Sequence, residues 1–108
     1  MTKPSTLPTR DGLALHLRHW PTAPGASARG RILLVHGLGE HIGRHERLAA
    51  ELNAQGWAVA GYDLRGHGRS EGAKGRVRKT DDMLSDLAAV IDSLRSELPK
   101  LPLLLLGH

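Results

Sequence analysis

Residues 33–45 read LLVHGLGEHIGRH, and this stretch carries the strongest indication of the fold. Its three opening apolar residues run into His36 and Gly37, and then into a loop with two more glycines, Gly39 and Gly43. A short apolar run that ends in glycine is typical of a strand buried on both faces. Glycine lacks a Cβ, so another group can come close to the backbone there. Because α/β sheets bind ligands in loops at the carboxyl ends of strands, we expect an active-site edge here.

The residues before this stretch predict a strand and a loop. Leucines at 13, 15 and 17 show the period of two that a half-buried strand has, and His19 and Trp20 follow them. Residues 1–11 are polar and broken by prolines, so we expect an irregular or edge segment there. Residues 21–30 form a loop by composition, and residues 31–36 form the buried strand.

The residues after the glycine loop predict a helix, a strand and a long loop. Apolar residues at helical spacing predict a helix over 44–55, with Gly56 where its C-terminal cap belongs. Residues 57–62 (WAVAGY) then predict another strand. Residues 64–79 are glycine-rich, basic and without an apolar period, which favours a loop.

The last thirty residues predict a second helix and a final strand. Residues 80–82 supply the cap and the acidic first turn of the helix. Its expected apolar stripe consists of Leu84, Leu87, Val90 or Ile91, Leu94 and Leu98. Four consecutive leucines at 103–106 predict another strand buried on both faces, and we assign them to the core.

This order of elements indicates an α/β fold with a mostly parallel sheet and flanking helices. Such a sheet needs helices on both faces, and two helices cannot cover four or five strands. We therefore expect residues 1–108 to be the N-terminal segment of a single larger domain, with an incomplete sheet.

Composition and charge narrow the class of protein. A chain of 108 residues with 40% hydrophobic and 24% charged residues is typical of one globular domain at most. Lys and Arg outnumber Asp and Glu by 15 to 11, but the 3% aromatic content argues against a nucleic-acid partner. The sequence has no cysteine, no secretory signal pattern and no apolar run of membrane-spanning length. We therefore expect a cytoplasmic protein without a transmembrane segment.

Three motifs follow the three expected parallel strands and so lie on one edge of the sheet. They are HGLGEH at 36–41, DLRGHGRSEG at 63–72 and LLLLGH at 103–108. Together they resemble the α/β-hydrolase superfamily, and more narrowly its monoacylglycerol lipase or lysophospholipase-like branch, also called serine aminopeptidase-like hydrolases. The resemblance covers residues 6–108, with the motifs in the family's order. It implies the N-terminal portion of one α/β-hydrolase domain, ending just before the nucleophile serine.

The resemblance also implies the chemistry of a serine ester hydrolase. Gly107 and His108 would open the G-x-S-x-G nucleophile elbow, so the triad serine, acid and histidine are expected outside this chain. The backbone N–H of Leu38 would donate to the oxyanion formed at the acyl carbonyl, while Gly37 and Gly39 keep the approach open. The implied substrate is a small acyl ester, cleaved without a metal or cofactor. On its own, the 108-residue chain is expected to be inactive.

A second group of residues is expected to orient the loops rather than to react. The resemblance implies that the histidines brace the loops by hydrogen bonding and that none of them is the triad base. Glu40 and Arg44 would pair across the junction of loop and helix, with a solvent-exposed pair as the alternative. Asp63 and Arg65 would brace the second loop, with simple turn chemistry as the alternative. The full set is His36, Gly37, Gly39, Glu40, His41, Arg44, Asp63, Arg65 and His67.

Three other classes of function compete with this hypothesis. Seven histidines invite a metal site, but Gly43 lies between His41 and His45, and no carboxylate completes a zinc spacing. The glycines of 37–43 nearly match a dinucleotide fingerprint with Asp63 as the ribose-binding acid, yet the third glycine is one residue late. A binding module or catalytically inactive hydrolase fragment is the third class, since the chain lacks an assigned nucleophile, acid and base.

The sequence leaves the exact substrate open among a monoacylglycerol, a lysophospholipid, another ester, a thioester and a peptide. The basic run at 65–79 is either a solvated loop or a peripheral contact with membrane headgroups. The sequence also leaves the cap domain and the oligomeric state open.

Overall fold

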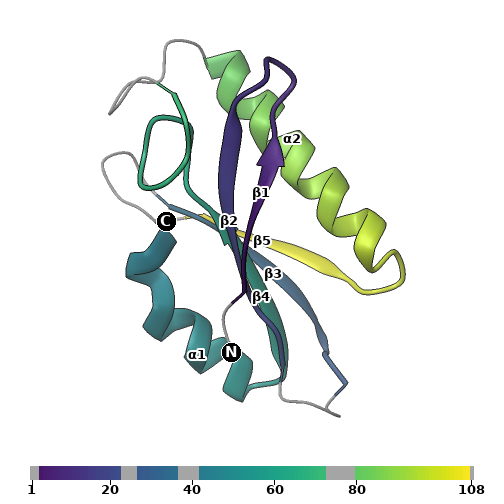
Figure 1. Ribbon diagram of the computed structural model, residues 1–108. Coiled ribbons are helices and arrows are strands. Elements are labelled where there is room, and N and C mark those ends of the chain that lie inside the picture. Colours follow the sequence, from purple (N-terminus) through teal and green to yellow (C-terminus); the bar gives the residue numbers. More distant parts are fainter. Residues whose placement is uncertain (1–2, 23–26, 37–41, 73–79, 108) are drawn as a thin grey trace.

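The computed structural model describes residues 3–22, 27–36, 42–72 and 80–107, and its centre is a five-stranded sheet (Figure 1). The spatial order of the strands is β1-β2-β4-β3-β5. β3, β4 and β5 pair in parallel, whereas β2 is antiparallel to both β1 and β4. Four of the five strands therefore run in one direction, as expected for a mostly parallel sheet. The strands are β1 (Lys3–Pro8), β2 (Ala14–Trp20), β3 (Gly30–Val35), β4 (Trp57–Tyr62) and β5 (Leu103–Gly107).

Two helices, α1 (Glu46–Ala54) and α2 (Thr80–Glu97), cover opposite faces of the sheet (Figure 1). Alternate residues of the strands point to the two sides, so two separate cores form. The core under α1 contains Trp20, Ile32, Leu34, Ile42, Ala49 and Val59. The core under α2 contains Leu15, Leu17, Leu33, Ala60, Tyr62, Leu64, Val90 and Leu94.

The direction of the connections reverses at β3. From β3 the chain passes through α1 to its neighbour β4, and from β4 it crosses through α2 to β5 on the other side of β3. The register sets Val35, at the end of β3, opposite both Tyr62 and Gly107. The carboxyl ends of the three parallel strands are therefore level, at the kind of switch point where open α/β sheets bind ligands.

The structure moves several of the predicted boundaries. The N-terminal residues form an edge strand, β1, paired with β2. β3 ends at Val35, so His36 lies just after the strand. A short 3-10 helix, Ile42–His45, precedes α1. α1 therefore begins at Glu46, two residues later than predicted, and His45 occupies its N-terminal cap position. Gly56 follows the helix with a φ of 93°, the left-handed conformation expected of a glycine after a helix.

The predicted apolar stripe of α2 is wrong at both ends. Leu84 and Leu98 are 58% and 43% exposed, whereas Val90 and Leu94 are buried. At ~100° per residue, Leu84 is offset from Leu94 by about 80° around the helix axis, but Met83 by only about 20°. Met83 is accordingly the side chain that packs on the core, and Leu98 lies beyond the end of the helix. No helix in the described ranges is long and apolar enough to cross a membrane.

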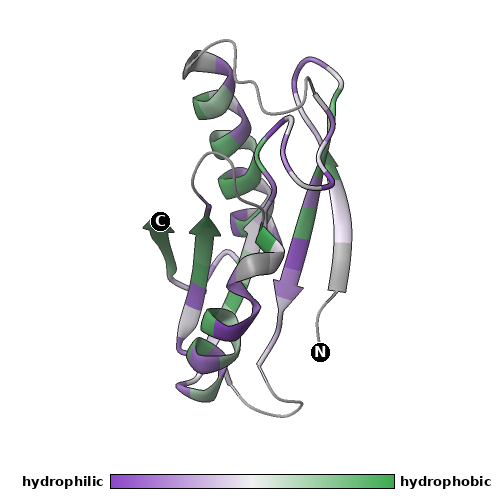
Figure 2. Ribbon diagram, turned by 90° about the vertical axis from the view of Figure 1, so that its left-hand side faces the viewer, coloured by the Kyte–Doolittle hydropathy of each residue, from purple (hydrophilic) through white to green (hydrophobic). Residues whose placement is uncertain are grey.

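The prediction that residues 103–106 are buried on both faces is also wrong for this chain. Leu104, Leu105 and Leu106 are 49%, 56% and 42% exposed, and only Leu103 packs on the core. Among the described residues β5 pairs only with β3, so it is an edge strand, and it forms an apolar margin of the molecule (Figure 2). Burial of a strand depends on neighbours on both sides, which a run of leucines cannot specify by itself.

Candidate functional site

The loop that follows β4 folds around the side chain of Asp63. Within this loop the N–H of His67 donates to the carbonyl oxygen of Leu64 at 2.9 Å, and the N–H of Ser70 donates to that of His67 at 3.0 Å. Gly68 has a φ of 50°, and a Cβ placed on it would meet the Asp63 carboxylate at 2.5 Å. The close turn of the loop over the carboxylate therefore requires glycine at this position.

Asp63 connects this loop to the segment that follows β3. Asp63 is 2% exposed, and its carboxylate accepts two backbone hydrogen bonds. Oδ2 accepts from the N–H of Arg69 at 3.0 Å, and Oδ1 accepts from the N–H of Ile42 at 2.6 Å. Ile42 is fully buried in the core under α1. Ile42, the residue directly after 37–41, is therefore held both by the packing of its side chain and by the hydrogen bond of its backbone N–H.

His36 holds the other end of the same segment. The ring is buried, and its Nε2 accepts a hydrogen bond from the N–H of Leu64 at 2.8 Å. Because a backbone N–H can only donate, Nε2 must be the unprotonated nitrogen of the ring. The ring of His67 lies 5.6 Å away, and its Nδ1 is 3.0 Å from the carbonyl oxygen of Arg65. Both ends of 37–41 are thus attached to two consecutive residues of the β4 loop, Asp63 and Leu64.

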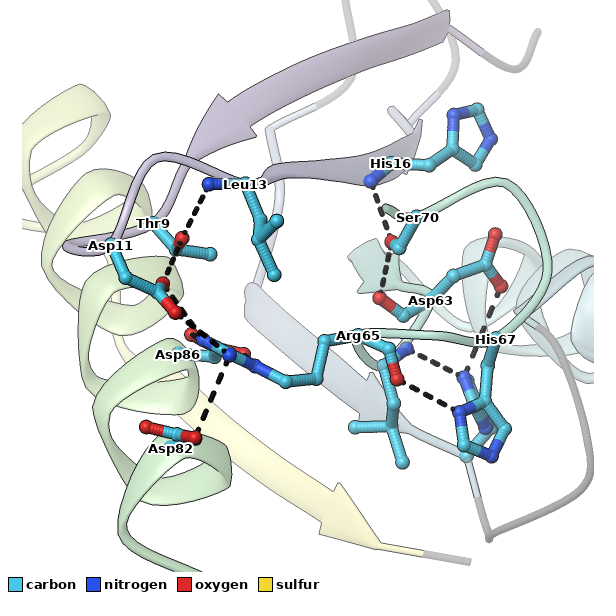
Figure 3. A network of polar contacts seen from close by, with 12 residues as sticks. Thr9, Asp11, Leu13, His16, Asp63, Arg65, His67, Ser70, Asp82 and Asp86 are labelled. Carbon is cyan, nitrogen blue, oxygen red and sulfur yellow. Dashed lines mark hydrogen bonds and ion pairs between the residues drawn. The ribbon is translucent and has the colours of Figure 1, made fainter. Parts of the chain in front are cut away.

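Arg65 is the centre of a second polar network, drawn in Figure 3. Its Nε and Nη2 donate to the two carboxylate oxygens of Asp86 at 2.7 and 2.8 Å. Its Nη1 and Nη2 each donate to Asp11 at 3.0 Å, and Asp82 lies 3.6 Å from Nη1. Thr9 extends the network, since its hydroxyl donates to Asp11 at 2.6 Å. The guanidinium therefore joins the β1–β2 turn, the β4 loop and α2.

These contacts favour the charged forms of Arg65 and Asp11. Hydrogen bonds to Asp86 and then to Asp11 hold the pKa of the Arg65 guanidinium above its usual range. The hydrogen bond from Arg65, followed by that from Thr9, holds the pKa of the Asp11 carboxyl well below its usual range. Charge-assisted bidentate bonds of this kind fix orientation as well as distance.

The β4 loop is also hydrogen-bonded along the first half of β2. The N–H of His16 donates to the hydroxyl of Ser70 at 2.8 Å, and that hydroxyl donates to the carbonyl oxygen of Asp63. The N–H of Ala14 donates to the carboxylate of Glu71 at 2.8 Å, and the N–H of Glu71 donates back to Ala14 at 2.9 Å. β2 pairs with β4 over its second half and with the loop over its first half.

Residues 68–72 match the letters G-x-S-x-G of a nucleophile elbow, but their structure is not that of an elbow. Ser70 is 9% exposed, and its hydroxyl already makes one hydrogen bond as donor and one as acceptor. An elbow serine stands exposed on a turn between a strand and a helix, whereas Ser70 is buried within residues 63–72, which contain neither. Ser70 is therefore a bracing residue of the loop.

The structure brings together four of the residues singled out in the sequence: His36, Asp63, Arg65 and His67. Gly107 ends β5 at the same edge, opposite Val35. The expected oxyanion donor and its neighbours lie outside the described residues, as does the side chain of Arg44 and with it the expected pair of Glu40 and Arg44. The residues outside are Gly37, Leu38, Gly39, Glu40, His41 and His108.

Six residues whose side chains take part in these networks were not selected from the sequence: Thr9, Asp11, Ser70, Glu71, Asp82 and Asp86. Two signals were available for part of this set. Ser70 closes the DLRGHGRS motif, and Asp82 and Asp86 are four residues apart, which places them on one face of α2. Nothing local marks Asp11 as a partner of Arg65, because the two are 54 residues apart.

The polar groups that the structure describes at this edge do not suit a metal ion or a nucleotide ribose. Nε2 of His36 and Nδ1 of His67 already contact backbone groups, the N–H of Leu64 and the carbonyl oxygen of Arg65. Within the described ranges no three His, Asp or Glu side chains form a group that could hold a metal. Asp63, the candidate ribose ligand, is buried and uses both oxygens for backbone N–H groups.

Comparison with known proteins assigns the chain to a family. Residues 26–108 match the family described as serine aminopeptidase, S33. Monoglyceride lipase from Homo sapiens is 38% identical over 98 residues, which are 91% of this chain and 32% of the human protein. Monoacylglycerol lipase from Mycolicibacterium smegmatis is 35% identical over 85 residues, covering 79% of this chain and 30% of the relative. The chain belongs to the serine aminopeptidase (S33) family of α/β hydrolases.

Solved structures show the same fold. A soluble variant of monoglyceride lipase from Saccharomyces cerevisiae, in complex with a substrate analogue, superposes with a TM-score of 0.86 at 29% identity. The match covers 100% of this chain and 35% of the yeast protein. A thermostable carboxyl esterase from Bacillus coagulans gives a TM-score of 0.84 at 23% identity over 99% of this chain and 36% of that protein. The chain thus spans about a third of the length of these relatives.

Proposed function

We propose that residues 1–108 are the N-terminal segment of one α/β-hydrolase domain, within a serine ester hydrolase that cleaves a monoacylglycerol, a lysophospholipid or a similar small ester. The observation that carries this proposal is the attachment of both ends of 37–41 to Asp63 and Leu64 at the switch point of the sheet. The printed names of the relatives, monoglyceride and monoacylglycerol lipase, support the substrate class.

In this proposal a serine that follows His108 attacks the acyl carbonyl carbon and gives its proton to the triad histidine. The carbon–oxygen bond to the alcohol then breaks as the histidine returns that proton to the leaving alcohol. Water adds to the acyl-enzyme in the same way and releases the acid and the serine. The N–H of Leu38 donates to the oxyanion in both steps, and one such donor is worth ~3 kcal/mol. The reaction needs no metal or organic cofactor.

The residues around 37–41 act in this proposal by position. An oxyanion donor must already point at the place where charge develops, because reorganising it during the reaction would cost free energy. His36 and Asp63 fix the two ends of the segment, and Arg65 and His67 fix the loop to which those ends are attached. The same orienting role is assigned to Gly37, Gly39, Glu40, His41 and Arg44.

The test compares the full-length protein that carries residues 1–108 with the 108-residue chain. Both are assayed with a monoacylglycerol and a p-nitrophenyl ester, and both are treated with a fluorophosphonate that labels activated serines. The full-length protein is expected to hydrolyse both esters and to take one label, whereas the 108-residue chain does neither. A full-length protein that turns over neither ester and takes no label would overturn the proposal in favour of an inactive hydrolase or binding module.

A further inference from the structure

Three carboxylates from two distant parts of the chain surround one guanidinium next to the candidate site. Asp11 comes from the β1–β2 turn, and Asp82 and Asp86 come from α2. The carboxylates differ in depth, since the Asp11 side chain is 54% exposed, that of Asp82 34% and that of Asp86 4%. Asp86 is therefore the partner that holds Arg65 from inside the protein.

We propose that Asp86 is a positioning residue for His36 and Ile42, the residues on either side of 37–41, and that it acts through Arg65. This inference rests on the proposed function, because it concerns the efficiency of that same site. Asp86 itself lies on α2, outside all three motifs that mark the site, and touches Arg65 rather than the segment.

The connection runs through three consecutive residues of the β4 loop. Asp86 fixes the side chain of Arg65 by two bonds of 2.7 and 2.8 Å. The residue before Arg65 is Leu64, whose N–H donates to His36, and the residue before that is Asp63, whose carboxylate accepts from Ile42. A displacement of Arg65 is therefore transmitted to the contacts of His36 and Ile42 through no more than two peptide units.

The chemistry of the pair favours a positioning role over general stabilisation. Burying two charges costs desolvation, and a well-packed apolar pair of similar size would stabilise the fold at least as well. A bidentate guanidinium–carboxylate pair, however, restricts rotation and distance in a way that apolar contacts do not. The Arg65 side chain is 11% exposed, so water competes little for these bonds.

The experiment uses the full-length protein with Asp86→Asn, Arg65→Lys and a matched control, Asp92→Asn. Asp92 is exposed on the same helix, so the control makes the same chemical change away from the network. In Asp86→Asn and Arg65→Lys we expect kcat for a p-nitrophenyl ester to fall by about 10-fold to about 100-fold, with KM within about 2-fold. Affinity for a trifluoromethyl ketone, which forms an oxyanion on the serine, should fall by the same factor. Asp92→Asn should match the parent protein in all three quantities.

The measurements are made at a temperature at which circular dichroism shows each variant folded, so that lost stability does not appear as lost rate. If Asp86→Asn does not fold, Asp11→Asn removes the exposed bidentate partner instead and should lower kcat in the same direction. Folded variants with the parent's kcat and ketone affinity would overturn the inference. Failure of the proposed function is a different result, because the parent protein itself would then neither hydrolyse the ester nor take a fluorophosphonate label.

Discussion

Replacing Asp63 by Asn tests the attachment of the 37–41 segment with a change of one atom. The carboxylate accepts from Ile42 and Arg69 with separate oxygens, whereas an amide offers one oxygen and one NH2 group. One of the two backbone N–H groups must then face a donor inside the protein, at a site that is 2% exposed. A buried donor without a partner costs about 1–3 kcal/mol, and the lost bond was made to a charged group, so we expect a loss of about 3 kcal/mol.

The assay is urea unfolding of the full-length variant, with Asp92→Asn as the control for the same change on the surface. With an m-value of about 2–3 kcal/mol/M, the midpoint should fall by about 1 M, and kcat of the folded variant by at least about 10-fold. Asp92→Asn should change neither quantity. A midpoint for Asp63→Asn within about 0.2 M of the parent, together with an unchanged kcat, would refute the reasoning, because the carboxylate would then not be holding Ile42.

Two further predictions concern groups that face the β4 loop. Ser70→Ala leaves the N–H of His16 without its acceptor, so urea unfolding should show a loss of about 1–3 kcal/mol in the free energy of unfolding. Labelling by the fluorophosphonate should persist in this variant. Loss of the label would mean that Ser70 is the reactive serine. Burial lowers the pKa of His16 below its ordinary 6.5, so the folded protein binds fewer protons there than the unfolded chain does. The free energy of unfolding should therefore fall as the pH drops below 6.5 toward the lowered pKa of His16. His16→Gln should lessen that fall between about pH 8 and about pH 5.5. Equal pH dependences of the variant and the parent protein would contradict this expectation.

The elements of the fold were predictable because each has a local signal. The apolar runs before His36 and after Gly56 identify β3 and β4, and the glycine itself marks the end of α1. The order of strands and helices then implies a parallel arrangement, which places the motifs at one edge.

The partners of the polar groups were not predictable in the same way. Asp63 and Arg65 were expected to brace a loop. The partner of Asp63 lies in the 3-10 helix before α1, and the partners of Arg65 lie in α2 and in the β1–β2 turn. Such pairs join residues up to 54 positions apart and follow no period in the sequence. The prediction that β5 is buried on both faces was wrong for a related reason. A run of four leucines has the same sequence pattern in an edge strand as in a central strand.

The most direct test of the account is to locate the reactive serine. The full-length protein is treated with a fluorophosphonate, digested, and its peptides are sequenced by mass spectrometry. We expect a single adduct on a serine directly after His108, in the peptide that contains β5. An adduct on Ser70, an adduct elsewhere in the chain, or no adduct in a folded protein would contradict the claim that residues 1–108 lead into the nucleophile of a serine hydrolase.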